Sequence, residues 1–360
     1  MVRLTRAQQQ ERTRAAVLAA AREEFAEHGY ADARVDRIAE RAELTRGAVY
    51  SNFPSKRALY VAVLIDSIEP PDVAPTAPSP GLGEATGAFA RGWLDRLPLS
   101  GTTPANGRLR PYSLAAVFDD APGRTVLTQL TKLEALLFGL ALESCAPDDT
   151  RRVRRVKLAE LVLTLLSGVG YLAETAPGFG DPFDVARACE HLASLDFADT
   201  WDAPHLPFIA PARAIQDTWR SPAESVDHIT GRRVAFDADG VIAVLGTSRL
   251  EAAEEAVRGA HPGDQVSVVV VTSDPAELGR LVRLRITNLT RCLRPVFGPW
   301  TCPGLRLILD DSAAVASALG VAHADDTEAA VRVRAGKITA RANGLGAAHA
   351  VATSRPRSPV

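Results

Sequence analysis

The chain has 360 residues, which is too long for one ordinary hydrophobic core and predicts two or three domains. With 46% hydrophobic and 23% charged residues, it is expected to be globular and soluble. No apolar run reaches the length of a membrane span, and the opening stretch MVRLTRAQQQERTR lacks the apolar centre of a signal peptide, so we expect a cytoplasmic protein without a membrane partner. Four cysteines exclude a disulfide scaffold and would stay reduced in that compartment.

The net charge of −2 hides an asymmetry along the chain. Residues 1–60 carry eleven Lys or Arg and eight Asp or Glu, a net of +3, so the remaining 300 residues sum to −5. A small basic module on an acidic body indicates a polyanionic partner at the N-terminus.

Two Pro-rich breaks, at 70–83 and 199–213, divide the chain into three parts. We predict a multidomain protein with an all-α helix-turn-helix head at residues 1–68, a helical body at 84–198 and an α/β domain at 214–350.

The head is predicted to hold four helices. The first spans about 7–27 and stops at Gly29, and the second follows the apolar spacing of residues 35–42. Thr45 and Ser55 can cap the third and fourth helices through their hydroxyl groups. Two short helices joined by a tight turn form a helix-turn-helix, whose second helix presents its N-terminal residues to the major groove of double-stranded DNA.

The exposed chemistry of this second helix suits DNA. Hydroxyl groups can contact phosphates or base edges, a guanidinium can bind guanine, and glycine permits close approach. A lysine in the first turn of the fourth helix complements a phosphate, as does the helix N-terminus itself. The candidate DNA-binding residues are Thr45, Arg46, Gly47, Tyr50, Ser51 and Lys56.

The stretch AAREEFAEHGYADARVDRIAERAELTRGAVYSNFPSKRALYVAVL resembles the DNA-binding domain of the TetR/AcrR family of transcriptional regulators over about 50 residues. The resemblance implies a homodimer that binds a two-fold symmetric operator. It also implies that Tyr50 and Lys56 contact phosphate, while Thr45, Arg46 and Gly47 lie near bases. The matching positions are Phe25, Gly29, Tyr30, Ile38, Ala39, Ala42, Tyr50, Phe53, Ser55, Lys56 and Leu59.

Two features depart from the family pattern. Glu43 stands in the turn where the family usually has a glycine with positive φ, and we expect its side chain to point away from the DNA backbone. Ala33 and Arg34 replace two threonines before the second helix, and Arg34 could still reach a phosphate.

The body is predicted to contain helices within 125–146, 148–177 and 182–197. The resemblance implies that the last two form a four-helix dimer interface across about 151–197, and that the helices before them enclose a pocket for a small apolar effector. Ordinary core packing is the alternative for each pocket residue, and Cys145 and Cys189 are interpreted as core residues. The pocket candidates are Trp93, Phe118, Leu133, Leu137, Phe138 and Tyr171.

The tail alternates strands and helices in the order ββαβαβαββ, with hairpins predicted at DADG and at AG and a buried strand at QVSVVVV. This order, with LILDDSAAVASALGV and VRVRAGKITA, resembles a thioredoxin-like or peroxiredoxin-like domain. At the position of that fold's reactive cysteine this chain has Ser248, so we expect a fold retained without its usual catalysis. Cys292 and Cys302 are placed in a loop, ten positions apart and without the spacing of a CxxC pair or zinc site.

Together these patterns predict a ligand-responsive DNA-binding regulator, expected to be a repressor, with no enzymatic activity, cofactor or metal. A thiol oxidoreductase, or a regulator that senses oxidation through Cys292 and Cys302, remains the alternative, because Arg291 and Arg294 could lower a thiolate pKa.

Overall fold

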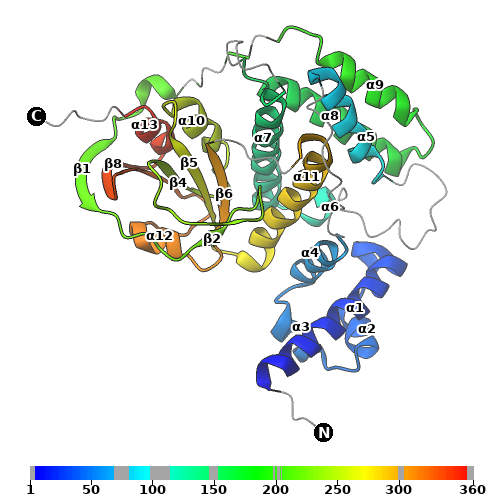
Figure 1. Cartoon of the computed structure of the whole chain (residues 1–360). Helices are drawn as coiled ribbons and strands as arrows, with labels where there is room; N and C mark the ends of the chain where they lie inside the picture. Colours follow the sequence, from blue (N-terminus) through cyan, green and yellow to red (C-terminus); the bar gives the residue numbers. More distant parts are fainter. Residues whose placement is uncertain are drawn as a thin grey trace, which may run out of the picture.

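The computed structural model describes residues 5–68, 81–97, 114–145, 153–197, 199–200, 203, 205–298 and 304–354. Figure 1 shows three lobes, with the blue N-terminal head at the bottom, the helical body at the upper right and the sheet of the α/β domain at the left. The predicted class, an all-α N-terminal region followed by an α/β region, is confirmed. Of the candidate site residues, Cys302 lies outside the described residues.

The head consists of four helices. They are α1 (Arg6–Asp32), α2 (Val35–Arg41), α3 (Arg46–Asn52) and α4 (Lys56–Asp66). Gly29 has a φ of 72° and a non-helical backbone, so the predicted stop at this glycine is present as a break, after which one further short turn runs to the end of α1 at Asp32.

Side-chain caps fix where the short helices begin. The Thr45 hydroxyl accepts a hydrogen bond from the Ala48 N–H at 3.2 Å, and the Ser55 hydroxyl accepts one from the Ala58 N–H at 2.9 Å. Both predicted caps are therefore present. They satisfy N–H groups that the first turn of a helix leaves without intrahelical partners.

An aromatic cluster fills the centre of the head. The ring of Phe25 meets that of Tyr60 edge-on at 4.9 Å, and Tyr30 lies 5.1 Å from Tyr60. Ile38 of α2 and Val49 of α3 are buried against this core. Burying one such side chain contributes about 1.5–3 kcal/mol, so the core fixes the relative orientation of α2 and α3.

Within its described residues, 81–97, 114–145 and 153–197, the body has five helices. α5 begins at Leu82, inside the Pro-rich break where the sequence predicts no helix. The body helices are α5 (Leu82–Leu94), α6 (Leu114–Val117), α7 (Ala121–Glu143), α8 (Val156–Thr175) and α9 (Pro182–Leu192).

By length and composition alone, α7 and α8 are apolar enough to cross a membrane. In the most apolar 18-residue stretch of α7, 67% of the residues are buried, which identifies α7 as the core helix of the body. In the most apolar 18-residue stretch of α8 only 39% of the residues are buried, and the large apolar side chains of Leu161 and Tyr171 are exposed.

The α/β domain is built on a six-stranded mixed sheet in the order β1-β8-β7-β4-β5-β6. Strands β4, β5 and β6 are parallel, whereas β7, β8 and β1 join by antiparallel pairing. The large-sheet strands are β1 (Arg213–Thr218), β4 (Gly240–Gly246), β5 (Gln265–Val271), β6 (Leu305–Leu309), β7 (Glu328–Arg334) and β8 (Lys337–Asn343). The 3-10 turn η1 (Leu206–Phe208) precedes them, and β2 (Ser225–Val226) pairs with β3 (Arg233–Val234).

The two faces of this sheet pack against different partners. Because side chains alternate along a strand, Val241 and Ala243 of β4 join the large core shared with the helices, while Ile242 and Val244 face a smaller core. Helix α12 covers the smaller core. The domain's helices are α10 (Ala252–Gly259), α11 (Arg280–Phe297), α12 (Ala314–Leu319) and α13 (Ala347–Ala352).

Several predicted details of this domain change. The hairpin at Ala335–Gly336 and the buried strand β5 are confirmed. The hairpin at DADG is wrong, because β4 pairs with β5 and β7 rather than with β3. The sequence patterns do not predict strand β1 or helix α13. The mixed sheet agrees with an α/β domain and does not by itself establish a thioredoxin-like fold.

The predicted cysteine loop is wrong at Cys292, and Cys302 lies outside the described residues. Helix α11 continues past the expected end, through Cys292 and Pro295 to Phe297, and Cys292 is a buried residue of this helix. The apolar positions of α11 recur on one face up to Val296, which explains why the helix does not end earlier.

Helix α11 connects the α/β domain with the rest of the chain. It packs on α4 of the head and on α5 and α7 of the body, and Figure 1 shows it running beside α7 toward α4. One apolar core consequently extends from Val17 in the head to Ala352 in α13.

The turn between α2 and α3 allows a direct test of backbone strain. Glu43 has a φ of 56°, a left-handed conformation that costs a non-glycine residue about 1 kcal/mol. We expect Glu43→Gly to raise the free energy of unfolding by up to about 1 kcal/mol in urea titrations. The matched control Glu40→Gly, at the end of α2, should lower it by about the same amount. Destabilisation by both substitutions would contradict the strain at Glu43.

Candidate nucleic-acid interface

Helix α3 presents its N-terminal end to solvent. Thr45, Arg46, Gly47 and Ser51 are exposed and Tyr50 is half-buried, while Val49 points into the head core. The candidate residues of α3 are therefore accessible, on a helix anchored by its opposite side. This is the geometry that a helix needs to enter a major groove.

Arg46 is held loosely at the start of α3. Its guanidinium lies 3.3 Å from an Asp36 carboxylate oxygen and 5.5 Å from the centre of the Tyr50 ring. The pKa of Arg46 is raised by its hydrogen bond to Tyr50 and then by Asp36. Arg46 and Asp36 both have side chains 62% exposed, and an ion pair this exposed contributes little, so a phosphate or base can displace it.

The hydroxyl groups of Thr45, the N-cap of α3, and of Ser51 are each partly occupied by hydrogen bonds. The Thr45 oxygen accepts the capping hydrogen bond, which leaves its O–H free to donate. The Ser51 hydroxyl donates to the Ala48 carbonyl at 2.8 Å, and its oxygen accepts from the Asn52 side-chain amide at 3.4 Å, which leaves one lone pair for a further donor. Thr45 is thus suited to phosphate or base acceptors, and Ser51 to base donors.

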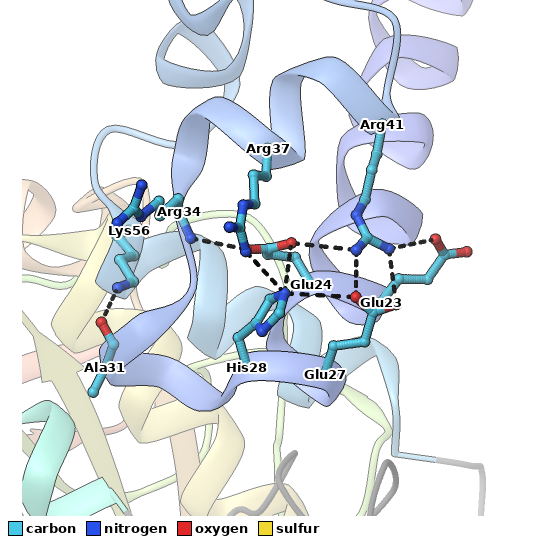
Figure 2. A network of polar contacts seen from close by, with 9 residues as sticks. All are labelled: Glu23, Glu24, Glu27, His28, Ala31, Arg34, Arg37, Arg41 and Lys56. Atoms are coloured by element: carbon cyan, nitrogen blue, oxygen red, sulfur yellow. Dashed lines mark hydrogen bonds and ion pairs between the residues drawn. The ribbon is translucent and has the colours of Figure 1, made fainter.

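Lys56 joins the start of α4 to the end of α1. Figure 2 shows its ammonium donating to the Ala31 carbonyl, at 3.0 Å, and it also lies 4.9 Å from the Tyr30 ring centre. Burial lowers the pKa of Lys56, and the charges of Asp32 and Glu24 oppose this shift. An ammonium has three donors, so Lys56 can hold this position and still contact a phosphate.

A buried carboxylate fixes α2 against α1. Glu24 is fully buried, and one of its oxygens accepts a hydrogen bond at 3.1 Å from the Arg34 N–H at the start of α2. The guanidinium groups of Arg41 and Arg37 lie 3.4 and 3.9 Å from the same carboxylate, as Figure 2 shows. This hydrogen bond involves only the backbone N–H of Arg34. The side chain of Arg34 is exposed and can contact a phosphate.

The same network contains a possible set of metal ligands. Glu24, Glu27 and His28 place one ligand atom each within 4.8 Å of one another. Arg41 also hydrogen-bonds Glu27 and lowers its pKa, and Arg37 lies 3.0 Å from the His28 ring nitrogen. Guanidinium groups thus already supply the positive charge, and we interpret this cluster as an ion-pair network between helices.

Sequence reasoning missed the contacts that hold the head to the rest of the chain. The guanidinium of Arg57 donates to Glu277 of the α/β domain and, at 2.6 Å, to Asp120 of the body. Its carbon also lies 4.9 Å from the centre of the buried Phe118 ring. Glu277 additionally accepts a hydrogen bond from the Ser55 hydroxyl. Because 220 positions separate Arg57 from Glu277, no local pattern could reveal the pair.

A second contact from α11 reinforces this connection. The Arg280 guanidinium lies 5.3 Å from the Phe53 ring centre and donates to the Ala58 carbonyl at 3.3 Å. Burial is the largest influence on Arg280 and lowers its pKa. The head is therefore held at the first turn of α4, directly after α3, which takes the place of the recognition helix in a helix-turn-helix.

The predicted effector residues separate into two groups. Trp93 and Tyr171 line a cavity of about 400 Å³ between α5, α6, α7, α8 and α11. Leu133 and Leu137 are fully buried core residues, as are Phe118 and Phe138. None of these four is among the residues that line this cavity, so their positions favour core packing.

Cys292 does not have the environment of a reactive thiol. Burial raises its pKa to about 11, and the nearby Arg96 and Arg291 only partly oppose the shift. A thiol with this pKa is protonated near neutral pH and is a poor nucleophile. Burial therefore raises the pKa of Cys292 by more than the neighbouring arginines lower it.

One family model matches part of the head. Residues 17–63 match the family model described as bacterial regulatory proteins, tetR family, which spans α2, α3 and most of α1 and α4. No curated protein matches the chain.

Solved structures of three regulators share low similarity with the chain. NalD of Pseudomonas aeruginosa, the secondary repressor of the MexAB-OprM multidrug efflux pump, is 20% identical over 51% of this chain and 96% of its own, with a TM-score of 0.33. A TetR transcriptional regulator from Rhodococcus sp. RHA1 is 22% identical over 53% and 99%, with a TM-score of 0.32. FadR, a fatty acid degradation regulator from Bacillus halodurans, is 15% identical over 50% and 96%, with a TM-score of 0.23.

At these identities and TM-scores, the solved structures carry no argument about the function of the body or of the α/β domain. The family match and the exposed recognition helix together support a DNA-binding transcriptional regulator, with a helix-turn-helix head of the tetR type.

Proposed function

With a DNA-binding head of the tetR type as the starting point, we propose that this protein is a cytoplasmic, dimeric transcriptional repressor that binds a palindromic operator and leaves it when a small effector binds the body. The observation that carries the proposal is the exposed end of α3, with Thr45, Arg46 and Ser51 presented to solvent and Lys56 placed at the adjacent helix start. These groups match the major-groove edges and phosphates of DNA.

The exposed apolar surface of α8 and α9 supports the dimer. Burying large side chains of this kind between two copies would contribute about 1.5–3 kcal/mol each. An interface in this region would bring two heads onto the two half-sites of a palindrome. The exposed residues on and beside these helices, from 42% to 75% exposed, are Leu161, Tyr171, Phe179, Phe183 and Leu195.

The cavity of about 400 Å³ between α5, α6, α7, α8 and α11 supports an effector site. Trp93, Leu163 and Leu289 give it apolar walls, while the ion pair of Arg285 with Glu134 lies at its border. We propose that the effector is a small, mainly apolar molecule. Its volume is bounded by the cavity of about 400 Å³.

Helix α11 offers a route from this cavity to the DNA-binding head. Arg285 and Leu289 of α11 line the cavity, and Arg280, at the start of the same helix, contacts α4. An effector that favours a shifted position of α11 would thereby favour a shifted head. This is a two-state equilibrium that ligand binding can bias.

We further propose that the α/β domain is a thioredoxin-like scaffold without catalysis. Ser248, at the expected thiol position, donates to the Asp325 carbonyl at 2.6 Å. Three neighbouring hydroxyl groups, from Thr247, Thr272 and Ser273, bond to the Asp325 carboxylate. Hydroxyl groups held in this way maintain a loop and supply no thiolate nucleophile.

DNA binding is tested with the full chain and its own upstream DNA. Fluorescence anisotropy should show an affinity that falls linearly with salt on logarithmic axes, since phosphate contacts release counterions. Arg46→Ala should weaken binding by about tenfold or more. Arg233→Ala, which removes a similarly exposed arginine from the α/β domain, should leave the affinity unchanged.

Absence of salt-dependent binding to the upstream DNA would remove the proposal. An equal loss of affinity in Arg46→Ala and Arg233→Ala would show that α3 has no specific part in it.

The dimer is tested by adding charge to its proposed interface. Phe183→Glu in α9 and Leu161→Glu in α8 should halve the mass measured by sedimentation equilibrium, because a buried unpaired carboxylate opposes association. Phe208→Glu, at an 88% exposed aromatic residue of η1, serves as the control and should keep the wild-type mass. A monomeric wild-type protein, or dimers in both interface variants, would contradict the proposed surface.

A further inference from the structure

The ring of Phe53 is contacted by guanidinium groups from two distant parts of the chain. Phe53 is fully buried and follows α3 directly as its C-cap residue. The Cζ of Arg14, in α1, lies 4.9 Å from the ring centre, and the Cζ of Arg280, in α11, lies 5.3 Å from it. The ring therefore holds two cations at the point where α3 ends and the turn to α4 begins. Arg14 and Arg280 are called the arginine pair below.

The two charges of the arginine pair repel each other. Burial is the largest cause that lowers the pKa of Arg280, and the positive charge of Arg14 is the next. Both side chains are half-buried, so water screens their repulsion less than it would on an open surface. An anion that contacts both guanidinium groups would offset this repulsion.

The carboxylates around the arginine pair are bound to other groups. Glu277 binds Arg57, and Asp311 lies 2.6 Å from the guanidinium of Arg283. Asp274 caps the turn before α11 and accepts a backbone N–H there at 3.0 Å. Among the residues that the structure describes, no ion pair reaches either member of the arginine pair. The pair thus has positive charge that these acids do not neutralise directly.

Arg280 also has hydrogen-bond donors left for an anion. A guanidinium carries five N–H groups, and the Nη1 of Arg280 uses one of them on the Ala58 carbonyl at 3.3 Å. The fork of a guanidinium matches two oxygens of a phosphate, which makes arginine a preferred phosphate ligand. The arginine pair therefore offers both the charge and the donors that a phosphate group needs.

The arginine pair lies next to the surface that is proposed to meet DNA. Phe53 stands between α3 and α4, three positions before Lys56. Figure 1 shows the yellow first part of α11 reaching the head beside α4, with the α/β domain at the left and helices α8 and α9 at the upper right. The α/β domain is thus on the side of the head away from the proposed dimer surface. A phosphate at this position belongs to the outer flank of a half-site, away from the centre of the palindrome.

Building on the proposed repressor function, we propose that Arg280 of the α/β domain and Arg14 of α1 together bind one backbone phosphate of DNA on the outer flank of each half-site. Such a phosphate supplies the negative charge between the two guanidinium groups and accepts their N–H groups. Phosphate contacts fix the position of a protein on the duplex without reading its sequence. The α/β domain in this way extends the DNA-binding surface beyond the helix-turn-helix head.

Ethylation interference on the upstream DNA tests this contact with the full chain, because it maps each phosphate that binding requires. Wild-type protein should show one required phosphate on the outer flank of each half-site, besides those close to α3. Arg280→Gln and Arg14→Gln should each lose this same outer position and keep the others. Each variant should also lower the slope of log affinity against log salt by about 0.9 for every head on the DNA.

A matched control lies on the same helix. Arg294, near the other end of α11, donates to the Ile229 carbonyl at 3.3 Å within the α/β domain. Arg294→Gln removes the same charge and should keep the wild-type interference pattern and salt slope. Circular dichroism verifies that all three variants fold.

A second comparison separates a DNA phosphate from a free one. Inorganic phosphate that replaces chloride at equal ionic strength should change the DNA affinity of wild type and Arg280→Gln by the same factor. A loss of affinity confined to the wild type would assign the arginine pair to a free anion and overturn the proposal.

The proposal is also overturned if Arg280→Gln keeps both the outer phosphate position and the wild-type salt slope. Weakening of every interference position together would show that Arg280 only holds the head in place, and would equally contradict it. Wild-type protein that binds no upstream DNA removes the repressor proposal and this inference together. DNA binding by the wild type with an unchanged Arg280→Gln variant removes this inference alone.

Discussion

The guanidinium of Arg57 joins all three parts of the chain. It extends from the first turn of α4 in the head, donates to Asp120 of the body and to Glu277 of the α/β domain, and covers the buried ring of Phe118. Burial opposes its charge, but the two carboxylates prevail and raise its pKa, while Arg57 in turn lowers the pKa of Asp120. Hydrogen bonds between charged groups contribute about 1.5–3 kcal/mol, which is large for one side chain that sets the position of a domain.

The contacts of Arg57 lie close to the helix that is proposed to bind DNA. Arg57 follows the recognition helix by only a few residues, and Asp120 also caps α7 by accepting from the Gly123 N–H at 2.6 Å. Helix α11 begins just after the turn that contains Glu277, and its residues Arg285 and Leu289 line the cavity between α5, α6, α7, α8 and α11. The α/β domain therefore supplies helix α11, which packs against the body, and Glu277, which binds Arg57 of the head.

The sequence predicts the head well because its signals are local. Thr45 and Ser55 cap their helices as expected, and the departure at Glu43 marks a residue with positive φ. The interpretation of Cys292 fails because prolines and glycines around it suggest a loop, whereas packing against the body extends α11 over Pro295. Strand partners and the Arg57 contacts bring distant residues together, and periodicity or turn signals within a short stretch of chain do not predict such pairings.

The central claim is that the α/β domain holds the head through Glu277 and Arg57. Amide hydrogen exchange of α4 in the full chain tests it most directly, by comparing wild type with Glu277→Ala. The account predicts exchange about tenfold faster or more in the first turns of α4, because loss of the charged hydrogen bonds lowers the free energy of local opening. Unchanged exchange throughout α4, with faster exchange confined to the turn that contains residue 277, would contradict it.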